Sequence, residues 1–327
     1  MLETMHISER ISQVWNELTR QNSHPQLTVA RHPAPGSIRV HYGWYVSREF
    51  WQSLRPEDQH LTRMIAIHRA AKSQPVFSHL SAAVLLGIPV HADLRKAAHI
   101  TTGSKGSCRP SKGLIRHARP LTALETVNVH GLRCTSPERT LLDLCAAETP
   151  ETALSFADSY MRANFRVGRA VDEEQLHIWR DHIAHSLTLA RGMRGTRIAT
   201  QLLTLADPRK DSVLESISHL QLHRLGFEVE LQVPVAGPHG RTYYADFKFR
   251  GLPLFGECDG KVKYTNPALL QGRSAGEQVY RDKRRDDWLQ GSTDNKVIHW
   301  GYPEGANPLA MTQRLQAFNV PIPQPPW

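Results

Sequence analysis

The sequence predicts an α/β (α+β) fold in which two domains are joined by a helical connector. Its 327 residues suffice for about two domains. Hydrophobic residues make up 40% of the chain and charged residues 22%, proportions typical of a folded globular protein that exclude wholesale disorder. Short β-like runs alternate with helical periodicity in the first and last thirds, whereas the middle is helical by period. This order indicates mixed sheets flanked by helices.

The first 150 residues predict helices around a small sheet. Residues 7–21 place apolar side chains on one face and predict an opening helix. The run SIRVHYGWYV, residues 37–46, predicts a short strand or a hairpin around Gly43. Further helices are predicted over 57–71, 78–88 and 136–147, the last with Ser136 as N-cap and Pro137 at its first position, and a small sheet over 98–134.

The remainder divides into a connector, a second domain and a tail. Residues 151–206 are predicted to form a helical connector without strands. From residue 207 to 318 the pattern predicts a helix, three strands, a helix and a strand, which is the order of a mixed sheet flanked by helices. Residues 319–327 form a proline-rich tail.

The charge balance favours a polyanionic partner. Forty Lys and Arg against thirty-one Asp and Glu leave a net charge of +9. DNA fits such a charge, although a basic and merely solvated surface is an open alternative. No apolar run approaches the roughly 20 residues of a bilayer span, and the N-terminus lacks the apolar core of a signal peptide. With four scattered cysteines that form no C-x-x-C pair, the chain is expected in the cytoplasm.

A predicted hairpin in the second domain brings two carboxylates together. If residues 241–250 and 252–260 pair across a Gly251-Leu252 loop, Asp246 lies opposite Glu257, and Tyr244 lies opposite Asp259. Carboxylates opposed at roughly 4.5 to 5.5 Å repel each other unless something neutralises them. A divalent cation such as Mg²⁺ or Mn²⁺ is the expected neutraliser, and no other cofactor is indicated.

Other charged residues surround this pair. Glu215, on the preceding helix, is a candidate third carboxylate, and Lys248 shares the face of Asp246 by strand alternation. Cations suited to phosphate contacts follow in the chain: Lys261, Lys263, Arg281, Lys283, Arg284 and Arg285. The charges of residues 277–285 also suit ordinary ion pairs along a helix surface, and that alternative stays open.

The last third of the chain contains, in this order, the segments SVLESISHLQLHRLGFEVELQVPV, YYADF, GECDGKVKY, EQVYRDKRRDDWLQG and VIHW. By these segments and their order it resembles the Vsr-related endonuclease domains of the PD-(D/E)XK superfamily. The resemblance implies a restriction-endonuclease-like mixed sheet and Mg²⁺-dependent cleavage of DNA, with Asp246 and Glu257 as metal ligands and Glu215 as an auxiliary acidic residue. Asp259 occupies the family's usual lysine position, so the lysine function falls to Lys261 or Lys248. His299 stands where such domains often have arginine.

Residues 37–147 contain the motifs HYGWYV, FSHLSAAVLLGI and HGLRCTSPERTLLDLC. By these motifs the segment resembles the AbiEi-family antitoxin region of toxin-antitoxin systems. In that family a winged helix precedes this region and binds promoter DNA, and the first residues here predict a remnant of it. Phosphate contacts near the wing are candidates for Arg31, Arg39, His41 and Tyr42, with a solvated hairpin edge as the alternative. The resemblance implies a second possible role, a non-catalytic antitoxin or transcriptional regulator with a cognate toxin as partner.

Three weaker patterns predict ordinary structure. His177, His182 and His185 lie on one predicted helix without the spacing of a metal site, and are expected on the surface. Ser78 and Ser81, beside His79, are expected to cap and pack a helix. Cys258 alternates with Glu257 and Asp259, so it is expected in the core.

Overall fold

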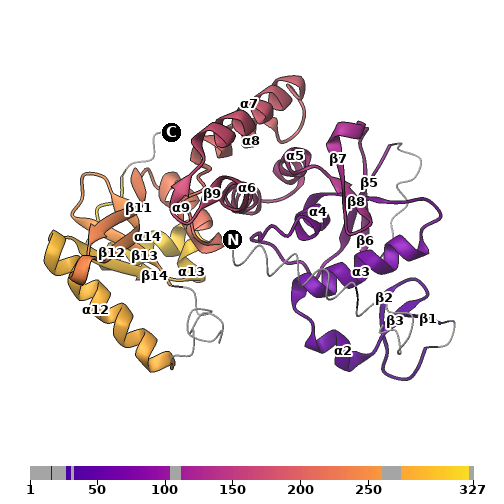
Figure 1. Ribbon diagram of the computed structural model, residues 1–327, viewed down its shortest axis with the longest axis horizontal. Coiled ribbons are helices and arrows are strands. Elements are labelled where there is room, and N and C mark those ends of the chain that lie inside the picture. The colour runs from indigo at the N-terminus through magenta and orange to yellow at the C-terminus, as the bar shows by residue number, and fades with distance from the viewer. Residues whose placement is uncertain (1–15, 17–26, 31–32, 104–111, 260–273, 324–327) are drawn as a thin grey trace. The chain divides into compact units, whose positions relative to one another are not determined.

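The computed structural model describes residues 16, 27–30, 33–103, 112–259 and 274–323, which form two compact units, Met1–Thr204 and Leu205–Trp327 (Figure 1). The predicted opening helix over 7–21, apart from residue 16, lies outside the described residues, as do Arg31, Lys261 and Lys263. Within the described parts of the chain, no helix is both long and apolar enough to cross a membrane.

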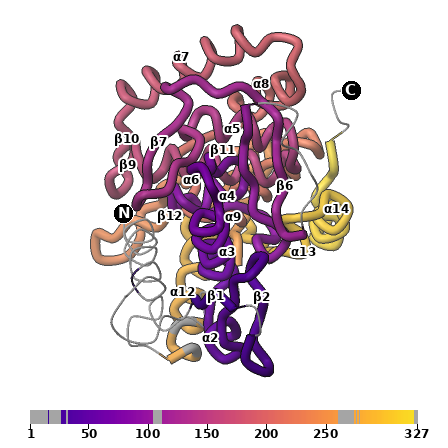
Figure 2. The backbone as a smooth tube through the Cα atoms, turned by 90° about the vertical axis from the view of Figure 1, so that its right-hand side faces the viewer, coloured from indigo at the N-terminus to yellow at the C-terminus, as the bar shows by residue number. Residues whose placement is uncertain are grey.

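The first unit begins with a small antiparallel sheet beside two helices. Its strands run in the order β1-β3-β2, where β1 is Thr28–Val29, β2 is Ile38–His41 and β3 is Trp44–Val46. Gly43 takes φ +74° in the turn between β2 and β3, so the predicted hairpin is confirmed. Helices α2 (Arg48–Ser53) and α3 (Pro56–Ala70) follow, and the sheet lies with α2 at one side of α3 in both Figure 1 and Figure 2.

A five-stranded mixed sheet forms the centre of the first unit. Its order is β6-β5-β4-β8-β7, with the bounds β4 Val76–Phe77, β5 Ala98–Thr102, β6 Leu114–Ala118, β7 Thr126–Val129 and β8 Leu132–Thr135. Helix α4 (His79–Leu85) packs against β5, and α5 (Pro137–Ala147) packs against α4. Ser136 caps α5 by accepting from the Arg139 N–H, as predicted. The core beside this sheet contains Met64 and Ile65 of α3 together with Ala82 and Leu85 of α4.

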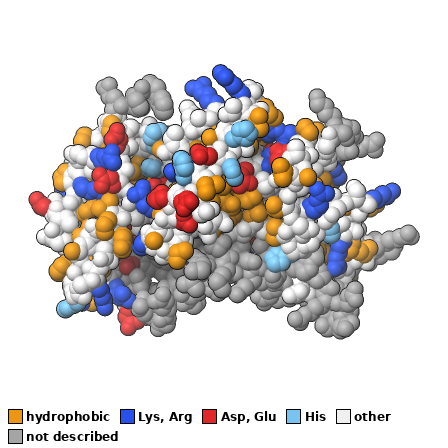
Figure 3. Space-filling model, turned by 45° about the horizontal axis from the view of Figure 1, so that its top comes forward, with side chains coloured by type: hydrophobic (Ala, Val, Ile, Leu, Met, Phe, Trp, Pro, Cys, Tyr) orange, Lys and Arg blue, Asp and Glu red, His pale blue; other side chains and the backbone are white. Residues whose placement is uncertain are grey.

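The helices predicted as a connector belong mainly to the first unit. They are α6 (Pro150–Phe165), α7 (Glu173–Leu189) and α8 (Thr196–Leu205). The prediction of helix throughout was wrong at one place, since β9 (Arg166–Val167) and β10 (Ala170–Val171) pair around Gly168, which takes φ +62°. His177, His182 and His185 are exposed on α7, as predicted. Figure 3 shows histidines scattered among acidic and basic side chains on one face of the molecule.

The second unit is a mixed four-stranded sheet between helices. Strands β11 (Val229–Ala236), β12 (Thr242–Phe249) and β13 (Leu254–Cys258) pair antiparallel in turn, and β14 (Lys296–Trp300) pairs parallel with β13. One face packs on α9 (Val213–Arg224) and α14 (Pro308–Ala317), with the short α13 (Tyr302–Gly305) beside them. The other face packs on α12 (Ala275–Thr293) through Leu289 (Figure 1). The predicted order of elements is confirmed from α9 to β14.

The register of β12 and β13 is the predicted one. Phe247 pairs with Gly256 and Lys248 with Phe255, on either side of a turn in which Gly251 takes φ +73°. Continuing this register places Asp246 opposite Glu257. Gly256 leaves room for the indole of Trp300, since a Cβ there would lie 2.2 Å from the ring. The sheet therefore brings the two carboxylates to one place.

Candidate functional site

Glu215 is fixed in the first turn of α9. Ser212 caps this helix by accepting from the Glu215 N–H at 3.1 Å, and its hydroxyl donates to the Glu215 carboxylate at 2.9 Å. The backbone N–H of Asp211 donates to the same carboxylate at 2.8 Å. Helix capping thus holds a buried carboxylate at the side of α9 that faces the sheet.

Gln232 connects Glu215 to Asp246, a contact that no sequence pattern predicts. Its Nε2 donates to Glu215 Oε2 at 2.8 Å and to Asp246 Oδ1 at 3.0 Å. In the alternation of β11, Gln232 shares a side with the exposed Glu228 and Glu230, which predicts a solvent-facing side chain. Its φ of +50° departs from strand geometry, and the side chain is buried. A left-handed non-glycine residue costs about 1 kcal/mol or more, so the two hydrogen bonds must offset this strain.

Asp246 and Glu257 meet on the neighbouring strands, as the hairpin register requires. Asp246 Oδ2 accepts from the Cys258 N–H at 2.8 Å. The guanidinium of Arg285, on α12, binds both oxygens of Glu257 at 3.0 and 3.1 Å and also donates to the carbonyl of Tyr244. Cys258 itself is buried among the core residues, as predicted. Two carboxylates and one arginine therefore share the end of the hairpin.

A second charged group adjoins this one through His299. The β13–β14 register pairs Glu257 with His299. The ring nitrogens of His299 lie 2.7 Å from Asp259 Oδ2 and 2.8 Å from Asp286 Oδ2, at ion-pair distance although off the direction of a good hydrogen bond. The imidazole thus lies between two carboxylates, one after β13 and one on α12.

The electrostatics of the site show an excess of negative charge. Burial and the charge of Asp246 raise the pKa of Glu215 to about 8. The same two causes raise the pKa of Glu257 to about 7, even though Arg285 opposes them. Burial alone would lower the pKa of His299, but Asp259 and Asp286 raise it to about 10, so the ring is protonated at neutral pH. The buried carboxylates are only partly compensated by protein cations.

The donor set suits a hard divalent cation. Carboxylate oxygens are the preferred ligands of Mg²⁺, and the raised pKa values of the two glutamates mark sites where added positive charge is favourable. Asp246 and Glu257 are the residues that would hold the ion, in exchange for part of the Arg285 contact. Glu215 reaches Asp246 through the Gln232 amide, and in the described residues the three carboxylates do not all lie within 4.8 Å of one another. Glu215 is therefore better placed to orient Asp246 than to share an ion with Glu257.

The basic residues named from the sequence take different places. Lys248 is bound to the carbonyl of Leu252 and, at 2.7 Å, to Asn295 Oδ1, so it anchors the hairpin loop instead of facing a phosphate. Arg281, Arg284 and Arg285 line an open groove of about 770 Å³. Arg241, His239 and Trp288 line the same groove. Lys283 is exposed on α12 and is not among the lining residues.

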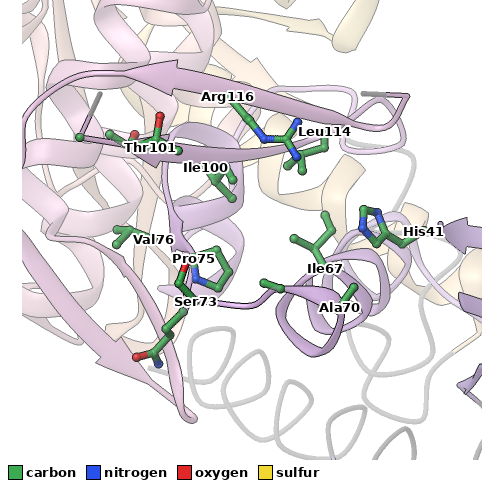
Figure 4. A pocket seen from close by; sticks show the side chains of 14 residues that line it. His41, Ile67, Ala70, Ser73, Pro75, Val76, Ile100, Thr101, Leu114 and Arg116 are labelled. Atoms are coloured by element: carbon green, nitrogen blue, oxygen red, sulfur yellow. The ribbon is translucent and has the colours of Figure 1, made fainter. Parts of the chain in front are cut away.

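In the first unit, the hairpin residues proposed for phosphate contacts also differ in their exposure. Arg39 is exposed on β2, and Tyr42, at the turn, is 86% exposed. His41 instead turns toward a cavity of about 720 Å³ that Arg116 and Leu114 also line (Figure 4). Burial and the charge of Arg116 lower the pKa of His41, so this imidazole is neutral at pH 7. Arg39 and Tyr42 are therefore the hairpin residues available to a partner.

Comparisons with known proteins add relatives but no family. No family model matches the chain. The chain is similar to two proteins of Mycobacterium tuberculosis, "Uncharacterized protein Rv2248" of strain H37Rv and "Uncharacterized protein MT2308" of strain CDC 1551. Each is 27% identical over 256 residues, which cover 78% of this chain and 82% of the relative. Because the first unit ends at Thr204, a match of 256 residues includes parts of both units.

The raised glutamate pKa values predict a pH-dependent stability. Glu215 and Glu257 titrate at about 8 and about 7 when folded, above the ordinary 4.5, so the folded chain holds more protons than the unfolded chain across this window. Without divalent cations, the free energy of unfolding should therefore fall as the pH rises from about 5 to about 8. Glu215→Gln should reduce this fall by roughly 1–3 kcal/mol, measured by urea unfolding at both pH values.

Glu228→Gln is the matched control, because it removes an exposed glutamate from the same unit. It should leave the pH dependence as in the wild type. Equal pH dependence in the wild type and Glu215→Gln would contradict a buried carboxylate with a raised pKa.

Proposed function

We propose that the second unit is a Mg²⁺-dependent DNA endonuclease domain and that the whole protein is a DNA-binding protein of a toxin-antitoxin or defence system. The observation that carries this proposal is the pairing of buried Glu257 with half-buried Asp246 beside a groove lined by arginines. DNA as substrate implies a place in the cytoplasm. The resemblance to Vsr-related PD-(D/E)XK domains supports the same assignment of Asp246 and Glu257.

Each part of the site has a role in phosphodiester hydrolysis. Bound Mg²⁺ or Mn²⁺ would polarise the scissile phosphate and lower the pKa of a water molecule. Asp246 and Glu257 would hold the ion, while Gln232 and Glu215 orient Asp246. Arg285 stays close enough to share the added negative charge of a phosphate after releasing part of Glu257.

His299 offers a replacement for the charge of the lysine that related nucleases carry. Asp259 stands at the lysine position, and Lys248 is bound elsewhere. His299 lies 2.7 Å from Asp259, is the register partner of Glu257, and is protonated at neutral pH. An imidazolium here stabilises negative charge that develops on a phosphate, but it cannot take a proton from water.

The arginine groove suits the DNA backbone. Arg281 and Arg284 are exposed, and with Arg241 they place several guanidinium groups along one open groove that also includes Arg285. Guanidinium groups bind phosphate oxygens in a bidentate way, which positions DNA without reading its sequence. The groove and the acidic pair share Arg285, so a bound strand would pass close to Glu257.

Replacement of Asp246 tests catalysis. Asp246→Ala and Asp246→Asn should lower Mg²⁺- or Mn²⁺-dependent nicking of supercoiled DNA at least about 100-fold, because both weaken the hold on the ion. DNA affinity should stay equal or rise, since a repelling carboxylate is gone. The assay is gel conversion of supercoiled to open-circular DNA at low salt, with Glu228→Ala as the control that should cut normally. Nicking that is independent of metal, or that proceeds in these variants at the wild-type rate, would contradict the proposal.

Replacement of Arg285 tests whether an ion and this guanidinium compete for Glu257. Arg285→Ala leaves a buried carboxylate unpaired and should destabilise the metal-free protein by about 3 kcal/mol. Mg²⁺ or Mn²⁺ should then raise the unfolding temperature more in Arg285→Ala than in the wild type, because the vacated carboxylate gains a cation. Arg284→Ala, one residue away and exposed, should show the wild-type response. No larger metal response in Arg285→Ala would show that Glu257 is not a ligand.

A second candidate function has its own support. All four carboxylate oxygens of Asp246 and Glu257 accept hydrogen bonds from protein groups, and Asp259 replaces the lysine. Such a site is also self-sufficient as a scaffold. In that case the protein is a non-catalytic antitoxin or transcriptional regulator that binds promoter DNA through the first unit and pairs with a cognate toxin.

Arg39 separates the two functions. In a regulator, Arg39→Ala should weaken binding of promoter DNA several-fold and reduce the salt dependence of binding by about one phosphate contact. The measurement is fluorescence anisotropy with DNA from upstream of its own coding sequence, over a series of salt concentrations. Arg95→Ala, which removes an exposed arginine elsewhere in the first unit, is the control. Loss of binding in Arg281→Ala but not in Arg39→Ala would assign the DNA contact to the nuclease-like unit instead.

A further inference from the structure

Three histidines that are distant in the sequence meet inside the first unit. His79 is the first residue of α4, His99 lies on β5 and His117 lies on β6. One ring nitrogen from each lies within 4.8 Å of the others, and among the described residues this is the cluster that could hold a metal ion. Nδ1 of His99 is 3.1 Å from Nε2 of His117, and the rings of His79 and His117 stack with centroids 3.6 Å apart.

The topology of the sheet creates this meeting. Strands β5 and β6 are parallel neighbours, and Thr101 pairs with His117. His99 is two residues before Thr101, so His99 and His117 project from the same face. Helix α4 packs on β5 and brings His79 to them. His79 takes φ +54°, a left-handed conformation that costs about 1 kcal/mol or more and that is concentrated at functional sites.

A nearby histidine shows what a structural histidine looks like in this unit. His60 is buried, and both of its ring nitrogens are used, one with the carbonyl of Leu94 at 2.7 Å and one with the hydroxyl of Ser81 at 2.8 Å. In the triad, Nδ1 of His79 lies 2.9 Å from the Ser78 hydroxyl, whereas His99 and His117 share a hydrogen bond between their ring nitrogens. The convergence of these ring nitrogens is also the arrangement of neighbouring ligands around one ion.

A buried carboxylate oxygen adjoins the triad. Asp143 is 1% exposed, and its Oδ2 lies 4.0 Å from Nδ1 of His79. Oδ1 of Asp143 binds Arg139 and Arg119, but Oδ2 has no hydrogen-bond partner among the described residues. An unsatisfied buried carboxylate oxygen is costly. A cation at the triad, or a water molecule bound to it, would satisfy this oxygen.

We propose that His79, His99 and His117 bind one divalent transition-metal ion of the Zn²⁺ class. Three imidazole nitrogens suit Zn²⁺, Co²⁺ and related ions, whereas Mg²⁺ prefers oxygen. The site is thus different in chemistry from the acidic pair at Asp246 and Glu257. His117 is half-buried, which leaves a side open for a water molecule or a small anion as fourth ligand.

Burial already prepares the imidazoles for this role. Burial, the two adjacent histidines and the nearby Arg139 and Arg119 hold the pKa of His79 at about 2, and burial with neighbouring histidines holds that of His99 at about 3. Burial also lowers the pKa of His117. All three rings are neutral at pH 7, so an ion would displace few protons.

Cobalt titration of the full-length, chelator-treated protein tests the site. Wild type should bind one Co²⁺ with the visible ligand-field bands of a four-coordinate ion, and Zn²⁺ should remove these bands. His117→Ala should weaken Co²⁺ binding at least about 100-fold, because loss of an outer partner alone costs 10–100-fold. His177→Ala should bind Co²⁺ as the wild type does, since His177 is exposed on α7.

Two further measurements guard against misfolding of the variant. His117→Cys restores a ligand, so it should bind Co²⁺ and add the intense charge-transfer bands of a Co²⁺–thiolate bond. Zn²⁺ should also raise the unfolding temperature of the wild type but not of His117→Ala. The proposal is overturned if the wild type shows no ligand-field bands, if His117→Ala binds Co²⁺ equally well, or if His117→Cys gives no charge-transfer bands.

Discussion

The buried negative charge between α9 and the four-stranded sheet is the constraint on which the second unit depends. Carboxylates at Glu215, Asp246 and Glu257 each need hydrogen-bond donors or a cation, because an unpaired buried charge costs several kcal/mol. The Asp211 N–H and the Ser212 hydroxyl donate hydrogen bonds to Glu215. Gln232 departs from strand geometry, and its amide donates to both Glu215 and Asp246. Helix α12 is packed so that Arg285 reaches Glu257. Apolar packing thus holds α9 and α14 on one face of the sheet. At the end of the β12–β13 hairpin, charged contacts hold α12 in place.

Local sequence patterns predict most of the helices and strands of the fold. The Gly251-Leu252 turn alone sets the register of β12 and β13, so the opposition of Asp246 and Glu257 was predictable from spacing. The features that residue spacing did not predict depend on tertiary contacts. Gln232 has the alternation of a surface residue, and only its positive φ turns it inward. Lys248 lies on the same face as Asp246 by alternation, yet its ammonium group is hydrogen-bonded to Asn295, which directly precedes β14. Strands β9 and β10 are two residues each, too short to leave a period.

The two groups of histidines show that closeness in the sequence does not predict closeness in the structure. His177, His182 and His185 are close in sequence, but they lie on exposed parts of one helix and do not converge. His79, His99 and His117 are about 20 residues apart, and no spacing rule links a helix start to two parallel strands. Their meeting follows from the order β6-β5-β4 and from α4 packing on β5, which a single sequence does not specify. The cluster could not be predicted from the sequence because it depends on long-range strand pairing and not on residue type.

Asp259 directly follows β13 and places a further carboxylate next to the acidic pair. An aspartate there adds negative charge beside two buried carboxylates, which would be unfavourable alone. His299, on the parallel neighbour of β13, lies between Asp259 and Asp286 and keeps its proton at neutral pH. The imidazolium therefore compensates one of the two aspartates, so that Asp259, His299 and Asp286 together keep one net negative charge. A neutral histidine or an uncharged residue at position 299 would leave the whole acidic group to Arg285, whose Nη1 and Nη2 are already bound to Glu257.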